Sequence, residues 1–172
     1  MQAQENFILR KAEPNDQETI WEILQQAILR RKNDGSSQWQ DGYPNSDTVR
    51  TDIENEFGYL LEIDGEIAAY SALIFNNEPA YENIEGKWLT DDDFFVVHRV
   101  AVSDQFLGKG IATKLFLVIE NFAKQKQVFS IKVDTNFDNL AMLKILKKLN
   151  YTYCGEVYFR GSARKAFEKL LR

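Results

Sequence analysis

The stretch VVHRVAV at residues 96–102, followed by SDQFLGKGIA at residues 103–112, decides the fold of this chain. Its first seven residues are mostly apolar and β-branched, which predicts a buried strand. The second part holds two glycines and leads into apolar residues at helical spacing, so a loop and then a helix follow. The first backbone N–H groups of a helix lack partners inside the helix, and the macrodipole favours negative charge there. The junction is therefore a candidate site for a phosphate or pyrophosphate group.

The composition is that of one globular domain. The chain has 172 residues, of which 44% are apolar, so it can bury a full core. We therefore expect a single domain over residues 1–172. The formal net charge of −5 argues against a nucleic-acid partner and suits a cationic one. One cysteine and one histidine provide neither a disulfide framework nor spaced zinc ligands, so no metal is expected.

The N-terminal residues 1–6 contain no basic region followed by an apolar core. No run of about 18 apolar residues occurs anywhere in the sequence. We therefore expect a cytoplasmic protein with no membrane partner.

The pattern along the chain predicts an α/β (α+β) fold with a mixed sheet. Asp64–Gly65 lies between two apolar runs and predicts the turn of an antiparallel hairpin. Around the glycine loop, the order strand, helix, strand predicts a parallel pair joined by a right-handed crossover. The expected strands are 7–10, 59–63, 67–75, 94–102, 129–134 and one that begins at 151, and the expected helices are 20–28, 46–54, 111–123 and 142–149.

Three features complete this prediction. The segment Asn76–Asp93 loses periodicity and gathers acidic residues, so we expect a long, exposed and mainly solvated insertion. Asp138 is the expected cap of the helix that follows it. The type of the segment Ala163–Leu171 stays open.

The spacing of the glycine loop excludes one other interpretation and disfavours a second, a dinucleotide-dependent oxidoreductase, which stays an alternative. A nucleoside-triphosphate loop needs a glycine five positions before Gly108 and a Ser or Thr after Lys109, and the sequence has neither. A dinucleotide-binding fold requires an acidic residue after the next strand, and Asp134 could serve as this residue. However, Thr113 occupies the position of the third glycine, and five residues separate Val102 from Gly108, where the fingerprint needs its first glycine directly after the strand. A plain tight turn is the structural alternative.

The pattern Q-x-x-G-x-G-x-A from Gln105 to Ala112 resembles the coenzyme A loop of the GNAT acyltransferases, and the order of predicted elements resembles their fold over nearly the whole chain. The resemblance implies a mostly antiparallel sheet flanked by helices, with one splayed parallel strand pair that binds acyl-CoA. It also implies acetyl-CoA as the co-substrate and an amine as the acceptor partner. Dimers are frequent in such families, so a homodimer is one possible assembly.

The resemblance assigns cofactor-binding roles to three segments. Backbone groups at the end of the first parallel strand would bind the pantetheine arm and the acyl carbonyl, where an aimed N–H stabilises developing negative charge. The loop and the first turn of the helix would hold the pyrophosphate, and Asn139-x-x-Met142 resembles the family's N-x-x-A segment. The implied residues are Val100, Ala101, Val102, Gln105, Phe106, Leu107, Gly108, Lys109, Gly110, Ile111, Ala112, Thr113, Asn136, Asn139 and Met142.

One departure from the family pattern concerns the proton donor to the leaving thiolate. Leu146 occupies the position of the family's tyrosine. Tyr151 or Tyr153 from the following strand could substitute for it, and we assign Tyr153 as a candidate catalytic residue; a structural aromatic is the alternative. Coenzyme A thiolate is a fair leaving group, so the reaction can also proceed without an acid.

His98 is the only histidine and lies in the strand that would face both substrates. At pH 7, neutralising a lysine-like amine costs roughly 4.6 kcal/mol, whereas an α-amine costs about 1.4 kcal/mol. His98, directly or through a water molecule, is therefore the candidate general base, and a satisfied buried histidine is the alternative. Arg99 would point to the opposite face of a regular strand and serve the structure. Cys154 is expected to be a small hydrophobe rather than a nucleophile.

The acceptor site in this fold is built partly from the loop between the first two helices. Trp39 and Tyr43 in this loop are candidates for an aromatic wall, and Asp41 is a candidate counter-charge for an amine. An aromatic pair that anchors the loop to the core is the alternative. We expect an N-acyltransferase that acts by direct attack in a ternary complex; a catalytically silent coenzyme A binding module is the alternative.

Overall fold

Asp64 and Gly65 form the predicted tight turn between the strands β2 (Gly58–Ile63) and β3 (Glu66–Phe75). Their φ angles are 51° and 85°. A two-residue hairpin turn requires positive φ at both central residues, which is why Asp-Gly suits it. The hairpin prediction is therefore confirmed. The computed structural model describes residues 4–172.

The chain divides into two compact units. Unit 1 comprises the residues up to Ala72 together with Arg99–Val118, and unit 2 comprises Leu73–His98 together with Ile119–Arg172. The single-domain prediction stays a prediction. The remaining elements are β1 (Phe7–Lys11), α1 (Gln17–Asn33), α2 (Ser46–Glu54), β4 (Glu85–Gly86), β5 (Phe95–Val102), α3 (Ile111–Gln125), β6 (Ser130–Thr135), α4 (Leu140–Lys148), β7 (Thr152–Phe159) and β8 (Ser162–Leu170), with 3-10 turns η1 (Pro14–Asp16), η2 (Pro79–Asn83) and η3 (Asp104–Phe106).

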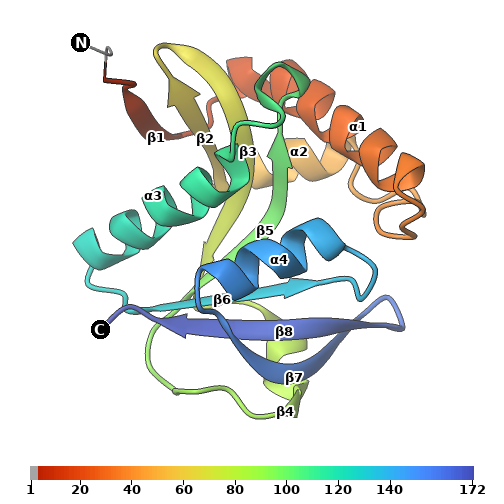
Figure 1. The fold of residues 1–172 in the computed structure, drawn as a ribbon, viewed down its shortest axis with the longest axis vertical. Coiled ribbons are helices and arrows are strands. Elements are labelled where there is room, and N and C mark those ends of the chain that lie inside the picture. Colours follow the sequence, from red (N-terminus) through yellow and green to blue (C-terminus); the bar gives the residue numbers. More distant parts are fainter. Residues whose placement is uncertain (1–3) are drawn as a thin grey trace. The chain divides into compact units, whose positions relative to one another are not determined.

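The strands follow the order β1-β2-β3-β5-β6-β8-β7-β4 in one eight-stranded sheet. β5 and β6 pair in parallel, whereas β1 with β2, β2 with β3, β6 with β8, β7 with β8 and β4 with β7 pair antiparallel. Within unit 2, Figure 1 shows β6, β8, β7 and β4 in succession. The predicted mixed, mostly antiparallel sheet with one parallel pair is therefore confirmed.

The core of unit 1 forms where α1 packs its apolar stripe. Ile20, Ile23, Leu24 and Ala27 recur at helical spacing and are all buried. They belong to one cluster with residues of α2, β2, β3, β5 and the loop after α1. That cluster contains Ala12, Ile20, Ile23, Leu24, Ala27, Trp39, Val49, Leu60, Tyr70 and Ala101.

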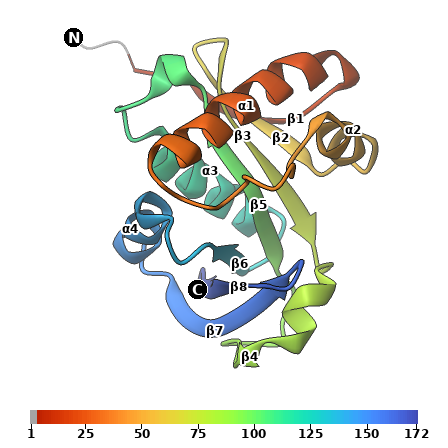
Figure 2. The ribbon, with the colours of Figure 1, turned by 90° about the vertical axis from the view of Figure 1, so that its right-hand side faces the viewer.

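Unit 2 contains the segment whose secondary structure the sequence did not decide. The segment expected over Ala163–Leu171 is the strand β8, which pairs with β6 on one side and β7 on the other. Figure 2 shows β7 and β8 as a long hairpin beside β6. The cap of α4 is Asn139, whose side chain accepts a hydrogen bond from the N–H of Met142, and not Asp138 as predicted. Asn139 lies one residue before the helix, where a side-chain oxygen reaches the free N–H groups.

The segment Asn76–Asp93 is more ordered than predicted. It contains η2 and β4, and β4 pairs with β7 at Gly86 and Gly155. A Cβ atom on either glycine would lie 2.1 Å from a backbone oxygen of the other strand, so only glycine permits this approach. Tyr81 in η2 is buried. Most of the segment is exposed, as expected, but Tyr81 is not, because backbone pairing that composition does not reveal attaches the segment to the sheet.

Candidate active site

The hydrogen-bonded pairing of the two parallel strands stops before either strand ends. The hydrogen-bonded register of β5 with β6 covers Phe95–Val97 against Ile131–Val133. β5 continues to Val102 and β6 to Thr135. Two residues after the last pair, Arg99 adopts φ 56°, which breaks the regular extended backbone. An early end of pairing between two parallel strands is what the family resemblance predicts for acyl-CoA binding.

The glycine loop in unit 1 offers free backbone donors. Gly108 and Gly110 have φ angles of 75° and 69°, and a Cβ atom on either would contact nothing within 4 Å. Within residues 4–172, the N–H groups of residues 108–113 donate to no protein group, and the first bond of the helix runs from the N–H of Lys114 to Gly110. The glycines are thus required by the loop's positive φ, and the space beside them is open. These observations fit a pyrophosphate on the loop.

Residues of α1 hold the start of this loop. The Arg30 guanidinium donates from Nη2 to the carbonyl of Val102 at 2.6 Å and from Nη1 to the carboxylate of Asp104. Gln26 accepts from the N–H of Asp104 at 2.9 Å. Burial lowers the pKa of Arg30 from its ordinary value. Sequence analysis missed Arg30, because its partners lie more than 70 residues away.

The six residues that we call the His98 cluster lie within unit 2. Its centre is the imidazole of His98, whose Nε2 lies 2.7 Å from Oε2 of Glu78 and whose Nδ1 lies 3.6 Å from Oδ1 of Asp134. The three side chains are between 3% and 14% exposed. A histidine held between two carboxylates and shielded from bulk water has the geometry of an oriented base. The cluster consists of Glu78, Tyr81, His98, Asp134, Phe159 and Arg164.

The other members of the His98 cluster fix the two carboxylates and enclose the ring. Tyr81 donates its hydroxyl to Asp134 Oδ1 at 2.6 Å, and burial together with this carboxylate raises the pKa of Tyr81 well above its ordinary value. Glu78 accepts from the N–H of Ala80 with its other oxygen at 3.2 Å. The ring of Phe159 lies 5.9 Å from that of His98 in an edge contact. The cluster therefore combines two fixed carboxylates with an apolar wall.

Sequence analysis identified His98 but missed the rest of the cluster. Glu78 falls in the segment that was expected to be solvated, yet its side chain is only 14% exposed. The 3-10 turn η2 brings Glu78 and Tyr81 to β5, because the Glu78 side chain caps the turn that contains Tyr81. Pro79 directly after Glu78 is a local signal for this turn. Nothing in the sequence indicates that the turn lies beside His98.

Arg99 lies in a second buried network, within unit 1. Its guanidinium donates to both oxygens of Asp52, at 2.9 and 2.6 Å, and to the hydroxyl of Tyr43 at 2.6 Å. Tyr70 donates its hydroxyl to Asp52 at 2.5 Å. Burial alone would lower the pKa of Arg99, but Tyr43 and Asp52 leave it raised. Arg99 therefore has extensive structural contacts. The strand is not regular at Arg99, because its φ angle is positive.

The three candidate acceptor residues have different surroundings. Trp39 is 8% exposed and belongs to the core of unit 1. Tyr43 is half-buried and bonded to Arg99, and a cis peptide bond joins it to Pro44. Asp41 is exposed, and its carboxylate accepts from the N–H of Tyr43 at 3.4 Å. Of the three, Trp39 thus matches the anchoring alternative most closely.

The remaining predicted residues of unit 2 lie around α4 and on β7. Asn136 donates from its amide to Asp138, Asn139 caps α4, and Leu146 is fully buried. Tyr153 is 54% exposed on β7 and packs against Phe167 of β8. β8 and β6 separate β7 from β5, so Tyr153 lies three strands from His98, or about 14 Å at the usual strand spacing. The structure does not bring Tyr153 to His98.

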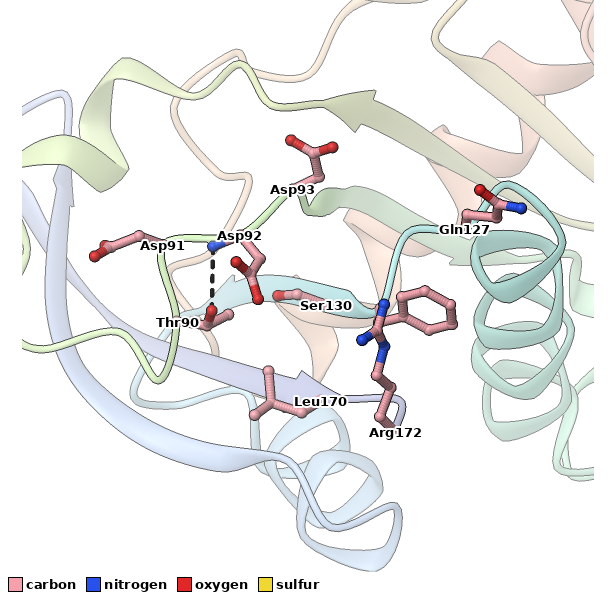
Figure 3. Close-up of a pocket in the computed structure, with 9 residues that line it drawn as sticks. Thr90, Asp91, Asp92, Asp93, Gln127, Ser130, Leu170 and Arg172 are labelled. Carbon is pink, nitrogen blue, oxygen red and sulfur yellow. Dashed lines mark hydrogen bonds between the residues drawn. The ribbon is translucent and has the colours of Figure 1, made fainter.

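A cavity of about 590 Å³ lies elsewhere in unit 2 (Figure 3). It contains none of the predicted site residues, and its lining includes Ser130, the residue at which β6 begins. Ser130 lies five residues from Thr135, a distance of about 16 Å along a strand. The cavity is lined by Thr90, Asp91, Asp92, Asp93, Gln127, Phe129, Ser130, Leu170 and Arg172. It therefore lies at the other end of β6 from Asp134.

Among residues 4–172 no helix is both long enough and apolar enough to span a membrane. This finding concerns the helices of the described part of the chain.

Comparisons with known proteins agree with this architecture. A crystal structure of a GNAT family acetyltransferase from Streptococcus agalactiae 2603 is 36% identical, covers 95% of each chain and has a TM-score of 0.87. A GNAT family acetyltransferase from Listeria monocytogenes is 21% identical, with 96% and 95% coverage and a TM-score of 0.77. The acetyltransferase yncA of Salmonella typhimurium, whose structure contains its cofactor acetyl-CoA, is 17% identical, with 97% and 95% coverage and a TM-score of 0.67.

The search of curated proteins finds no match. The model of the acetyltransferase (GNAT) family matches residues 19–151, which include the parallel strands β5 and β6, the glycine loop and His98. This chain belongs to the GNAT family of acetyltransferases.

Proposed function

We propose that this enzyme transfers an acetyl group from acetyl-CoA to a primary amine of a small molecule or peptide, with His98 as the general base. The observation that carries the proposal is the 2.7 Å contact of His98 Nε2 with Glu78 in a largely buried setting. Glu78 and Asp134 provide negative charge for an incoming ammonium group. The early end of pairing between β5 and β6, the free loop N–H groups and the family match support acetyl-CoA as the donor.

Residues of the loop and of β5 would hold the donor. The N–H groups of residues 108–113 would bind the pyrophosphate, with Lys109 adding charge and the Thr113 hydroxyl a further donor. The backbone of residues 100–102 would align the pantetheine arm, with Asn136, Asn139 and Met142 beside it. Acetyl-CoA supplies the acetyl group as an activated thioester.

The His98 cluster would prepare the acceptor. An ammonium nitrogen has no lone pair, so it must lose one proton before it can attack, which for a lysine-like amine costs roughly 4.6 kcal/mol at pH 7. His98, whose Nε2 is oriented by Glu78, would accept this proton at Nδ1. The amine nitrogen then gains a bond to the acetyl carbon as the carbon–sulfur bond breaks. Of the two protons that the ammonium loses, one ends on the coenzyme A thiol and one is released through His98.

The test is acetyl transfer by the purified protein with acetyl-CoA and a broad panel of amines, followed through release of the coenzyme A thiol and the mass of the product. Transfer that depends on His98 supports the proposal. Calorimetric titration with acetyl-CoA, with NAD as the control ligand, tests the loop independently. Binding of acetyl-CoA without acetyl transfer to any amine, with the same affinity in His98→Ala, would instead support a catalytically silent coenzyme A binding module. The observation that favours this alternative is Leu146 at the position of the family tyrosine.

A further inference from the structure

The His98 cluster contains a buried guanidinium whose hydrogen-bonding capacity is only partly used. Arg164 on β8 is 9% exposed. Its Nη1 lies 3.9 Å from Oδ2 of Asp134, which is longer than a hydrogen bond. Its Nε is buried and, among residues 4–172, has no hydrogen-bond partner. Because a guanidinium carries five N–H donors in a fixed fork, most of the donors of Arg164 remain available.

The available donors lie on one edge of the guanidinium group. Nη1 faces Asp134, whereas Nε and Nη2 form the adjacent edge, and Nη2 makes no hydrogen bond to the described residues. Two parallel N–H groups of this kind bind both oxygens of a carboxylate. Buried donors in folded proteins nearly always have a partner, so an unpaired one beside a candidate active site points to a ligand. The ligand group that fits this edge is an anion.

The sheet register places Arg164 on the same face as the proposed base. Asp134 pairs with Ala166 of β8, and Arg164 precedes Ala166 by two residues, so the side chains of Asp134 and Arg164 project from one face. Asp134 in turn lies 3.6 Å from His98. Phe159 lies beside both residues: its ring centroid is 5.9 Å from that of His98 and 5.6 Å from Cζ of Arg164. Base, aromatic wall and free guanidinium edge therefore form one neighbourhood.

We propose that Arg164 binds a carboxylate of the acceptor, so that the preferred acceptor is a zwitterionic amine such as an amino acid. This inference rests on the function proposed above. The amine of the acceptor lies at the Nδ1 side of His98, beside Asp134, and its carboxylate takes the Nε and Nη2 edge of Arg164. Asp134 also orients Arg164 through their ion pair. An amine without a carboxylate would interact with His98 and the carboxylates of the cluster but not with Arg164.

The experiment compares matched acceptors that differ only in the carboxylate. Phenylalanine with phenethylamine and leucine with isopentylamine are offered to the full-length enzyme at saturating acetyl-CoA, and kcat and KM are measured for each. The variants are Arg164→Gln and Arg164→Lys, with Arg160→Gln on the exposed turn of the same β7–β8 hairpin as the control. Because Arg164→Gln can disturb folding, thermal melts accompany each variant, and Arg164→Lys retains the charge while removing the bidentate fork.

With the wild-type enzyme the amino acid of each pair should be the better substrate. Arg164→Gln should lower kcat/KM for the amino acid about 10- to 100-fold, mainly through KM, because charge-assisted hydrogen bonds are lost. It should change kcat/KM for the amine less than about 3-fold, and Arg160→Gln should change neither. Arg164→Lys should recover only part of the loss.

Three results would overturn the inference. Preference of the wild-type enzyme for the carboxylate-free amines would reject it and leave the proposed function standing. Equal losses of kcat for both members of a pair in Arg164→Gln and Arg164→Lys would make Arg164 a residue that only positions Asp134. Absence of transfer to every amine would reject the proposed function, and the inference with it.

Discussion

His98 Nε2 lies 2.7 Å from Glu78 Oε2, so a histidine in β5 is joined to a carboxylate 20 residues earlier in the chain. The contact is fixed from both sides. The Glu78 carboxylate also accepts from the N–H of Ala80, and the imidazole packs against Phe159. An imidazole oriented in this way needs little rearrangement before it accepts a proton, which is the physical advantage of such a pair over an exposed histidine.

Removal of either member of this pair should slow acetyl transfer. We expect His98→Gln to lower kcat about 100-fold or more, and Glu78→Gln to lower it less, because Glu78 acts through the ring. Since a base must be unprotonated to act, His98→Gln should also flatten the loss of activity at low pH. The measurement is kcat against pH, with Glu82→Gln on the exposed side of η2 as the control. Equal profiles for His98→Gln and Glu82→Gln would exclude His98 as the base.

The network around Arg99 predicts a stability effect. Arg99 and Asp52 form a bidentate ion pair with side-chain exposures of 11% and 4%. Arg99→Met leaves the Asp52 carboxylate buried without its cation, which costs about 3–5 kcal/mol. Tyr70→Phe removes one hydrogen bond from the same carboxylate and should cost about 1–2 kcal/mol. Urea unfolding of both variants measures the difference, and equal losses would contradict this account of the network.

The open loop predicts where a charge blocks coenzyme A. Gly110→Glu places a carboxylate where the pyrophosphate is proposed to lie, and it should weaken acetyl-CoA binding at least about 10-fold beyond Gly110→Ala. Both variants carry the strain of a side chain at φ 69°, so their difference reports the longer, charged side chain without the backbone strain. Gly161→Glu, at φ 74° on the β7–β8 turn with equally open surroundings, is the control for stability. Calorimetric titration measures the affinities, and similar values for Gly110→Glu and Gly110→Ala would remove the pyrophosphate from this loop.

The position of Tyr153 predicts a small catalytic effect. Its ring is half exposed and three strands from β5. Tyr153→Phe should therefore change kcat less than about 3-fold, because its hydroxyl lies far from the proposed base. A much larger fall in kcat in Tyr153→Phe would instead restore Tyr153 as the proton donor.

Local patterns predicted the parts of the fold that local physics determines. Asp64–Gly65 specified its turn through positive φ, and the apolar stripe of α1 specified its buried face. The glycine loop was recognisable because the positive φ values of Gly108 and Gly110 limit the residues that can stand there. These features depend on neighbours within a few positions of the sequence.

The partners of the candidate base were not predictable in the same way. Glu78 and Arg164 reach the His98 cluster through η2 and through the pairing of β8 with β6, and both depend on residues far apart in the sequence. Acidic composition around Glu78 is typical of a solvated segment, and an arginine in a terminal strand is typical of a surface. Only the three-dimensional structure shows that both side chains are largely buried within the His98 cluster.

Cys154 should be a poor nucleophile, in agreement with its expected role as a small hydrophobe. Burial, with the nearby Glu168 carboxylate, raises the pKa of its thiol, so the folded state favours the neutral form. As the pH rises above the ordinary thiol pKa, the unfolded chain loses this proton first, and the contribution to stability is lost. Iodoacetamide at pH 8 should therefore label the folded protein at least about 10-fold more slowly than the urea-unfolded chain. Equal labelling rates would show that the thiolate forms readily in the folded enzyme.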